Sequence, residues 1–214
     1  MRIRRVASKG LVLSRLPAAQ LRLLAQIPVH ADPAGSADAE DRLYQSPVRA
    51  PLDDTDDELV GDWNDHVIPD LRSEFARQLD CVQADLRAAR REPPPAARRK
   101  SAVREETPDD ETRDAPGDEE EESEDPVITP PNAAAPPETY ELVIPHHHVE
   151  SWFGALNQAR LVMQARYNFP ELETLESLVS LLASENLNPY LTSRFYTQLQ
   201  GALLELGMDV GENP

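Results

Sequence analysis

The residues best suited to chemistry in this sequence are three adjacent histidines, His146, His147 and His148. Imidazole is the commonest protein ligand for transition metals, so the run raises the question of a metal site. Neighbouring positions of a helix point about 100° apart, however, whereas a metal-binding pair such as His-x-x-x-His shares one face. The spacing therefore predicts neither a metal site nor a cofactor, and it leaves His146 with Glu150 as a weak candidate pair.

Two further residues could support catalysis. His66 has aspartates close to it in the sequence, and a histidine with a carboxylate partner could perform acid–base chemistry. Cys81 lies among apolar residues at helical spacing, where a small core residue is expected. The glycines are scattered singly and form no phosphate-binding or dinucleotide-binding pattern. A hydrolase or metal-dependent enzyme that uses His66 or His146 to His148 is therefore the alternative, and a non-enzymatic protein is the main prediction.

The stretch ALNQARLVM places an amide and a guanidinium, Asn157 and Arg160, among apolar neighbours of a predicted amphipathic helix. Their i, i+3 spacing lets both side chains reach one partner segment. In one interpretation Arg160 is a structural clamp that pairs with Asp85 or Glu74, while Asn157 binds loop carbonyls. In the other, Arg160 and Arg166 bind the carboxylate of a ligand or partner.

The sequence WFGALNQARLVMQARYNF, from Trp152 to Phe169, resembles the core motif of the DUF2017 family, a bacterial domain of unknown function. In that motif a tryptophan is followed by Leu-Asn, two free positions, Arg-Leu and a later arginine. The matching residues are Trp152, Leu156, Asn157, Arg160, Leu161 and Arg166. Weaker similarity extends to LVLSRLPAAQLRLLAQIP, VIPDLRSEFARQLDCVQADL and NPYLTSRFYTQLQGALLEL, in the same order along the chain.

The resemblance implies a mostly helical fold without an established activity. Members of the family are often encoded beside the ClpS adaptor, which delivers N-end-rule substrates to the Clp protease, and beside sulfur-carrier genes of cysteine synthesis. We therefore expect an interaction or regulatory protein with an unidentified protein partner, linked by this association to Clp-type proteolysis or sulfur metabolism. A transcriptional regulator is the second alternative, because some members are labelled so.

The elements that must position these residues are predicted from hydrophobic periodicity. The opening residues favour a β-hairpin that turns at Ser8-Lys9-Gly10, and Pro17 favours the first turn of a helix that stops at Pro28. An irregular loop is expected over residues 30–53. A helix with acidic residues in its first turn should begin near Asp54, and a long amphipathic helix should follow Pro69.

The middle of the chain has a different composition. Residues 105–125 hold thirteen acids and one base, so their net charge of −12 is about two thirds of the −18 of the whole chain. Residues 93–138 are rich in proline and acids and poor in large apolar side chains, which predicts a disordered linker. Beyond it, TYELVIP alternates like a strand that could join the hairpin, and three helices are expected to follow.

The predicted fold is mainly α with a small N-terminal β-hairpin (α+β), a helical bundle interrupted by the acidic linker. Its parts are residues 1–92, the linker 93–138, and residues 139–210, which should pack on the first part. The acidic net charge argues against nucleic acid and anionic membranes as partners, and one cysteine fits a reducing compartment. No apolar run suits a signal peptide or a membrane span, so a cytoplasmic location is expected.

Overall fold

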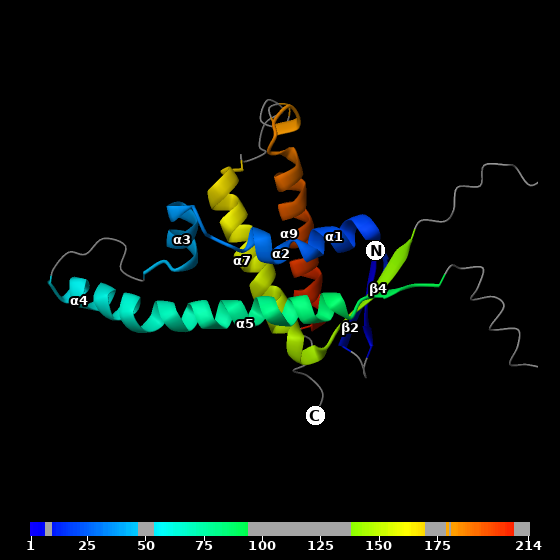
Figure 1. The fold of residues 1–214 in the computed structure, drawn as a ribbon, viewed down its shortest axis with the longest axis horizontal. Coiled ribbons are helices and arrows are strands. Elements are labelled where there is room, and N and C mark those ends of the chain that lie inside the picture. Colours follow the sequence, from blue (N-terminus) through cyan, green and yellow to red (C-terminus); the bar gives the residue numbers. More distant parts are fainter. Residues whose placement is uncertain (7–9, 47–53, 94–137, 170–178, 180, 208–214) are drawn as a thin grey trace, which may run out of the picture.

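The computed structural model confirms a mainly helical fold with a small antiparallel sheet (Figure 1). The residues that it describes are 1–6, 10–46, 54–93, 138–169, 179 and 181–207. The predicted hairpin turn and almost all of the predicted disordered linker lie outside these residues. Within them, no helix is long and apolar enough to cross a membrane.

The sheet has four strands in the order β1-β2-β4-β3. The predicted hairpin is confirmed by β1 (Arg2–Val6) and β2 (Gly10–Pro17), which pair antiparallel. Gly10 has a φ of +90, and a Cβ there would overlap the Ile144 carbonyl, so only glycine fits this start of β2. The sequence TYELVIP forms β4 (Thr139–Ile144) and pairs with β2, as expected.

The shortest strand, β3 (Arg90–Arg91), was not predicted. Arg90 and Arg91 follow the end of the long helix and pair with Glu141 and Tyr140 of β4. Glu92 extends the pairing, since its backbone N–H donates to the Thr139 carbonyl at 2.8 Å. The two ends of the segment 94–137 therefore lie side by side on the sheet.

The first helical region differs in two ways from the prediction. Pro28 does not stop a single helix: α1 (Ala18–Ala25) ends first, and Pro28 lies in the first turn of a new short helix, α2 (Ile27–His30). The expected irregular loop contains a helix, α3 (Ala37–Leu43), whose first turn is capped by the Ser36 hydroxyl. The alanines and acids of this stretch led to the prediction of a loop, but they are also compatible with a capped helix.

A long rod follows, made of α4 (Asp54–Asp62), the π-helix η1 (Trp63–Val67) and α5 (Ile68–Arg87). Figure 1 shows α4 projecting beyond the rest of the molecule at one end of this rod. Pro69 has no N–H to donate and its ring crowds the carbonyl four residues earlier, so the wider π turn before it lets the helix continue without that bond. The sequence indicates a break or a new first turn at Pro69, and Pro69 lies in the first turn of α5, directly after the π turn.

Two long helices, α7 (Val149–Tyr167) and α9 (Leu187–Gly207), complete the core and are predicted correctly. They run across α5 in Figure 1, and α7 packs against α9, α5, α3 and α2. The helix predicted between them falls mostly on residues outside the description. Two of its apolar residues that the structure describes, Val179 and Leu182, are 61% and 57% exposed.

The main core draws on both sides of the segment 94–137, which supports a single domain. Its fully buried large side chains include Leu11, Leu13, Leu24, Ile27, Leu142, Ile144, Trp152, Leu156, Tyr196 and Leu199. A second, smaller cluster lies under α3 and joins Ala39 and Leu43 to Val162 of α7, with Phe75 and Leu161 packed against it. The helix α3 is therefore held mainly by the far half of α7.

Candidate functional site

The motif that carries the DUF2017 resemblance lies along α7, and its first residues are structural. Trp152 and Leu156 are fully buried in the main core. The indole N–H of Trp152 donates to the buried carboxylate of Asp85 at 2.8 Å. That bond joins α7 to α5 across the crossing of the two helices.

Arg160 does not pair with either acid that was expected. Its guanidinium donates to the side-chain oxygen of Gln200 on α9, a buried neutral residue. Asp85 is bound by His148 and Trp152, and Glu74 is bound by Arg77. The structural interpretation of Arg160 thus holds with a different partner, and the ion pair with Asp85 or Glu74 is wrong, because the α5 acids are already bound elsewhere.

Asn157 and Arg166 also behave differently from the predicted clamp. Within the described part of the chain, the half-buried Asn157 side chain makes no hydrogen bond to a loop carbonyl. Arg166 is exposed and donates to the carbonyls of Asp32 and Ala34 at 3.0 and 3.3 Å. Arg160 and Arg166 therefore bind separate segments and do not converge on a shared carboxylate.

The later motif residues position α3. Leu161 packs into the small cluster beneath α3, and Arg166 fixes the turn that leads into this helix. The two ends of α3 are thus attached by α7, while its outer face is left to solvent. The hollows described next all touch this helix.

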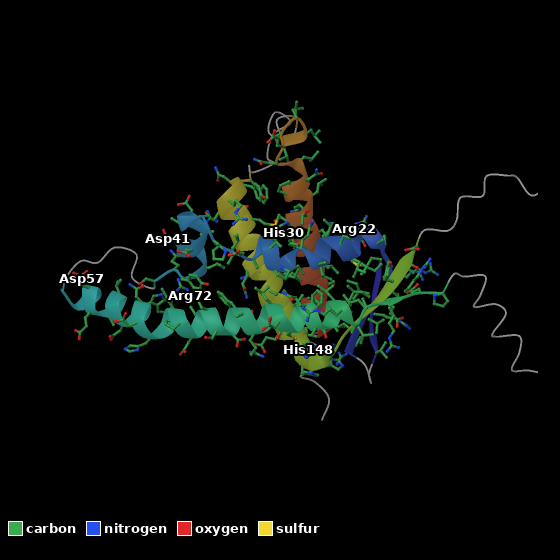
Figure 2. The ribbon with its side chains drawn as sticks, in the orientation of Figure 1. Arg22, His30, Asp41, Asp57, Arg72 and His148 are labelled. Carbon is green, nitrogen blue, oxygen red and sulfur yellow. The ribbon has the colours of Figure 1, made fainter. Side chains whose placement is uncertain are left out.

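A hollow lined mostly by polar side chains lies between α3 and the rod, and we call it the α3 groove. Its volume is about 410 Å³. The lining residues are Glu40, Asp41, Tyr44, Gln45, Ser46, Asn64, Ile68 and Arg72. Asp41 belongs to α3 and Arg72 to the rod, as their labels in Figure 2 show.

Aromatic contacts join the two sides of the groove. Tyr44 stacks on Phe75 with ring centroids 5.9 Å apart, and the Arg72 guanidinium lies 5.1 Å from the centre of the Tyr44 ring. The indole N–H of Trp63 donates to the Tyr44 carbonyl at 3.1 Å, which ties the end of α3 to the π-helix. Stacking on an aromatic face fixes a guanidinium while leaving its N–H groups available in the ring plane.

Two further hollows adjoin α3 and share Asp41 with the groove. One, of about 480 Å³, is lined by Asp38, Asp41, Arg42, Gln164, Ala165 and Asn168. The other, of about 590 Å³, is lined by Asp41, Arg42, Gln45 and Leu161. Charged and amide side chains dominate all three, so the surroundings of α3 form one continuous polar surface. Sequence reasoning missed this surface because it treated residues 30–53 as a loop, although Ser36 with its acidic followers is a capping signal.

The residues proposed for enzyme chemistry are dispersed. His66 is exposed on η1, and His146 and Glu150 are exposed near the start of α7, so the weak candidate metal pair is not supported. His148 is different: it is half-buried and its Nδ1 lies 3.0 Å from both carboxylate oxygens of Asp85. Cys81 is half-buried rather than a core residue, and it lies beside this pair.

Comparison with protein-family models, with curated proteins and with solved structures found no match. The resemblance to DUF2017 therefore stays a prediction.

Proposed function

We propose that this protein is a non-enzymatic interaction protein whose α3 groove binds an extended segment of a protein partner. The observation that carries the proposal is the gathering of three polar hollows around one short helix, with Asp41 of α3 and Arg72 of the rod both lining the first. Within the described residues, neither side chain forms an ion pair. Their charges are thus available to a partner.

The lining favours a polypeptide segment over a small apolar ligand. Small-molecule pockets are mostly apolar with a few polar groups, whereas six of the eight residues around the α3 groove are polar or charged. A fixed guanidinium recognises a carboxylate through paired hydrogen bonds, and Glu40 and Asp41 accept from backbone or side-chain N–H groups. The expected partner segment therefore offers both a carboxylate and hydrogen-bond donors.

The π-helix strengthens this location. Single π turns in α-helices occur often at functional sites, and here η1 supplies Asn64 and immediately precedes Ile68 in the groove. Links to Clp-type proteolysis, sulfur metabolism or transcription rest on the family resemblance alone, and the identity of the bound partner would decide among them. A hydrolase based on His66 has weaker support, because no carboxylate is bonded to its ring within the described residues.

The test is site-specific photo-crosslinking in the native host, with the crosslinker at Gln45 in the groove. We expect one discrete adduct. Arg72→Glu should reduce its yield about tenfold or more, because losing a charged contact buried in the complex costs ~1.4 kcal/mol or more of binding free energy. The matched control is Arg22→Glu, an exposed arginine of α1 far from the groove in Figure 2. The absence of an adduct, or an adduct that Arg22→Glu weakens as much as Arg72→Glu, would contradict the proposal.

A further inference from the structure

A thiol, a carboxylate and an imidazole meet on the opposite side of the molecule from α3. Cys81 and Asp85 stand four residues apart on α5, so their side chains share one face of the helix. His148 approaches from η2 (His146–His148), the short 3-10 turn that leads from β4 into α7. Figure 2 shows His148 below α5. One potential ligand atom from each of the three lies within 4.8 Å of the others.

The fold holds each member of this cluster in place. Asp85 is 7% exposed, accepts from Trp152 on Oδ2, and has His148 Nδ1 3.0 Å from both oxygens. Cys81 shares a side-chain hydrogen bond with Ser151, the residue before Trp152 on α7. Each group is therefore positioned by contacts that do not depend on a ligand.

The thiol is poorly suited to nucleophilic catalysis. Burial raises the pKa of Cys81 above its ordinary value. The hydrogen bond with Ser151 opposes this in part, the nearby Asp85 carboxylate raises the pKa further, and Arg77 has a smaller lowering effect. A raised pKa leaves the sulfur protonated at neutral pH, whereas reactive cysteines have lowered pKa values. A bound cation would reverse this, since a coordinating thiol loses its proton.

We propose that Cys81, Asp85 and His148 form a binding site for Zn²⁺. Thiolate sulfur, imidazole nitrogen and carboxylate oxygen are the donor set that zinc takes in proteins, and thiolate disfavours Mg²⁺ and Ca²⁺. Three protein ligands leave the fourth tetrahedral position to water. The ion would enter beside His148, whose side chain is 26% exposed.

The distances fit with small adjustments. Zinc with ligand bonds of about 2.0 Å to N and O and 2.3 Å to S separates its ligand atoms by roughly 3.3 to 3.5 Å. His148 Nδ1 and Asp85 Oδ1 are already 3.0 Å apart, and the 4.8 Å limit for the whole set is within reach of side-chain rotations. On binding, the Cys81 thiol proton leaves to solvent. The His148 proton leaves Nδ1 for solvent or is carried on Nε2 instead, so that Nδ1 can bind the ion. The Trp152 N–H remains on Oδ2, where it orients the carboxylate as an outer-shell donor.

The site would join parts of the chain that are distant in sequence. Cys81 and Asp85 precede the segment 94–137, and His148 follows it. Because a cation that binds only the folded state stabilises it, zinc would lock α5 onto the start of α7. The role is thus a structural or regulatory pin, in addition to the partner binding proposed above.

The experiment is a Zn²⁺ titration of tag-free protein by competition with a chelating indicator, repeated with Co²⁺ as a spectroscopic probe. We expect one ion per chain, an affinity that rises with pH as protons are displaced, and a sulfur-to-cobalt charge-transfer band. Cys81→Ser and His148→Gln should each lower the affinity more than about 100-fold, beyond what loss of an outer-shell partner costs. The band should vanish in Cys81→Ser.

The matched control is His146→Gln, which removes an exposed histidine from the same run. It should leave the affinity and the cobalt band unchanged, whereas His147→Gln also removes the ring that packs against His148 with centroids 4.2 Å apart. Failure of the wild type to bind Zn²⁺ with the indicator competing would overturn the proposal. It would equally be overturned if binding survived Cys81→Ser and was lost with His146→Gln or His147→Gln, since the ion would then be held by the surface histidines. Circular dichroism of each variant establishes that it is folded.

Discussion

At the scale of single residues, the buried carboxylate of Asp85 is the most consequential group in the structure. It accepts a hydrogen bond from the Trp152 indole N–H and lies beside the His148 imidazole, and the residue is only 7% exposed. A buried carboxylate is tolerated only where several donors bind it. Removing one donor leaves a carboxylate oxygen without its hydrogen bond. The chain offers a clean comparison, because its second tryptophan donates to a neutral acceptor.

Trp152→Phe should lower the free energy of unfolding by about 2 to 4 kcal/mol, through the lost hydrogen bond to a charged group and the cavity left in the core. Trp63→Phe removes an indole N–H that donates to the Tyr44 carbonyl in a half-buried setting, so it should cost only about 1 kcal/mol. Denaturant titrations measure both. In an Asp85→Asn background the cost of Trp152→Phe should shrink, and an unchanged cost there would show that the carboxylate contact contributes nothing.

Arg160 provides the second prediction at this scale. Arg160→Ala leaves the buried Gln200 oxygen without its donor and should destabilise by about 1 to 3 kcal/mol. Gln200→Met in the same chain should recover part of that loss, because no unsatisfied acceptor then remains. Combination with Glu74→Gln should be additive, since Glu74 binds Arg77 and Gln78. Coupling to Glu74 rather than Gln200 in a double-mutant cycle would contradict the observed pairing.

At the scale of elements, the crossing of α5 and α7 places Gly154 against a hydrogen-bonded side-chain amide. Gly154 of α7 faces the Gln78 amide, which bonds Gln158 at 2.8 Å and reaches Glu74 on its own helix. A Cβ at residue 154 would overlap that amide. The glycine is thus set by packing, against its poor helix propensity.

Gly154→Ala should destabilise by about 1 kcal/mol, because the cost of overpacking exceeds the gain in helix propensity. Gly201→Ala on α9 is the matched control. A Cβ there meets nothing within 4 Å, so the same change should stabilise by up to about 1 kcal/mol. Thermal melts of both variants give the signs. Stabilisation by both changes would mean that Gln78 moves aside freely and that the crossing is not limited by this contact.

The docking of α2 onto α9 is predicted to be pH-dependent. His30 Nδ1 lies 2.9 Å from the Tyr196 hydroxyl, which itself donates to the Leu23 carbonyl. Burial, with a smaller effect of the Arg166 charge, lowers the pKa of His30 below its ordinary 6.5. The unfolded chain therefore binds a proton at higher pH than the folded chain does, so the contribution of His30 is fully present above pH 6.5 and is lost as pH falls through the interval below it.

The measurement is the midpoint of denaturant unfolding across this pH range for the wild type and His30→Gln. The variant lacks the titrating group, so its stability should fall less on acidification than that of the wild type. His147→Gln, an exposed histidine, is the control and should follow the wild type. Parallel curves for the wild type and His30→Gln would show that burial of His30 has no effect on proton binding.

At the scale of the whole molecule, the two halves of the chain share one hydrophobic core, and the residues on either side of the segment 94–137 are paired in the sheet. The Glu92 N–H donates to the Thr139 carbonyl, and β3 pairs with β4 immediately before that bond. The insertion therefore spans a gap that a short turn can close. Its two ends need no rearrangement of the sheet.

Replacement of residues 94–137 by a Gly-Ser turn of about four residues should preserve the fold and stabilise it by roughly 1 to 2 kcal/mol, since closing a shorter loop costs less entropy. Thermal melts compare the full chain with the shortened chain. The control protein keeps residues 94–137 and carries the same Gly-Ser turn inserted beside them. A fall in the melting temperature of more than about 10 °C would show that the segment packs against the domain, because ~1 kcal/mol shifts it by only a few degrees.

The sequence by itself determined the class of fold, the hairpin, the added strand β4 and the long helices α5, α7 and α9. These follow from local periodicity, which each segment carries alone. It did not determine α3, whose alanines and acids suit both a loop and a helix until Val162 and Leu161 give it a surface to pack on. Nor did it determine β3, because two arginines become a strand only beside β4.

The contacts between side chains were decided by the tertiary structure for a physical reason. From the sequence alone, Asp85, Glu74 and Gln200 are all plausible partners for Arg160. Helix geometry does not choose among them, because it does not say which helices lie next to each other. The crossing of α5 and α7 commits Asp85 to His148 and Trp152, which leaves Arg160 to the neighbouring helix α9. The same crossing brings Cys81 beside His148, two residues 67 positions apart in the sequence that no local pattern could have joined.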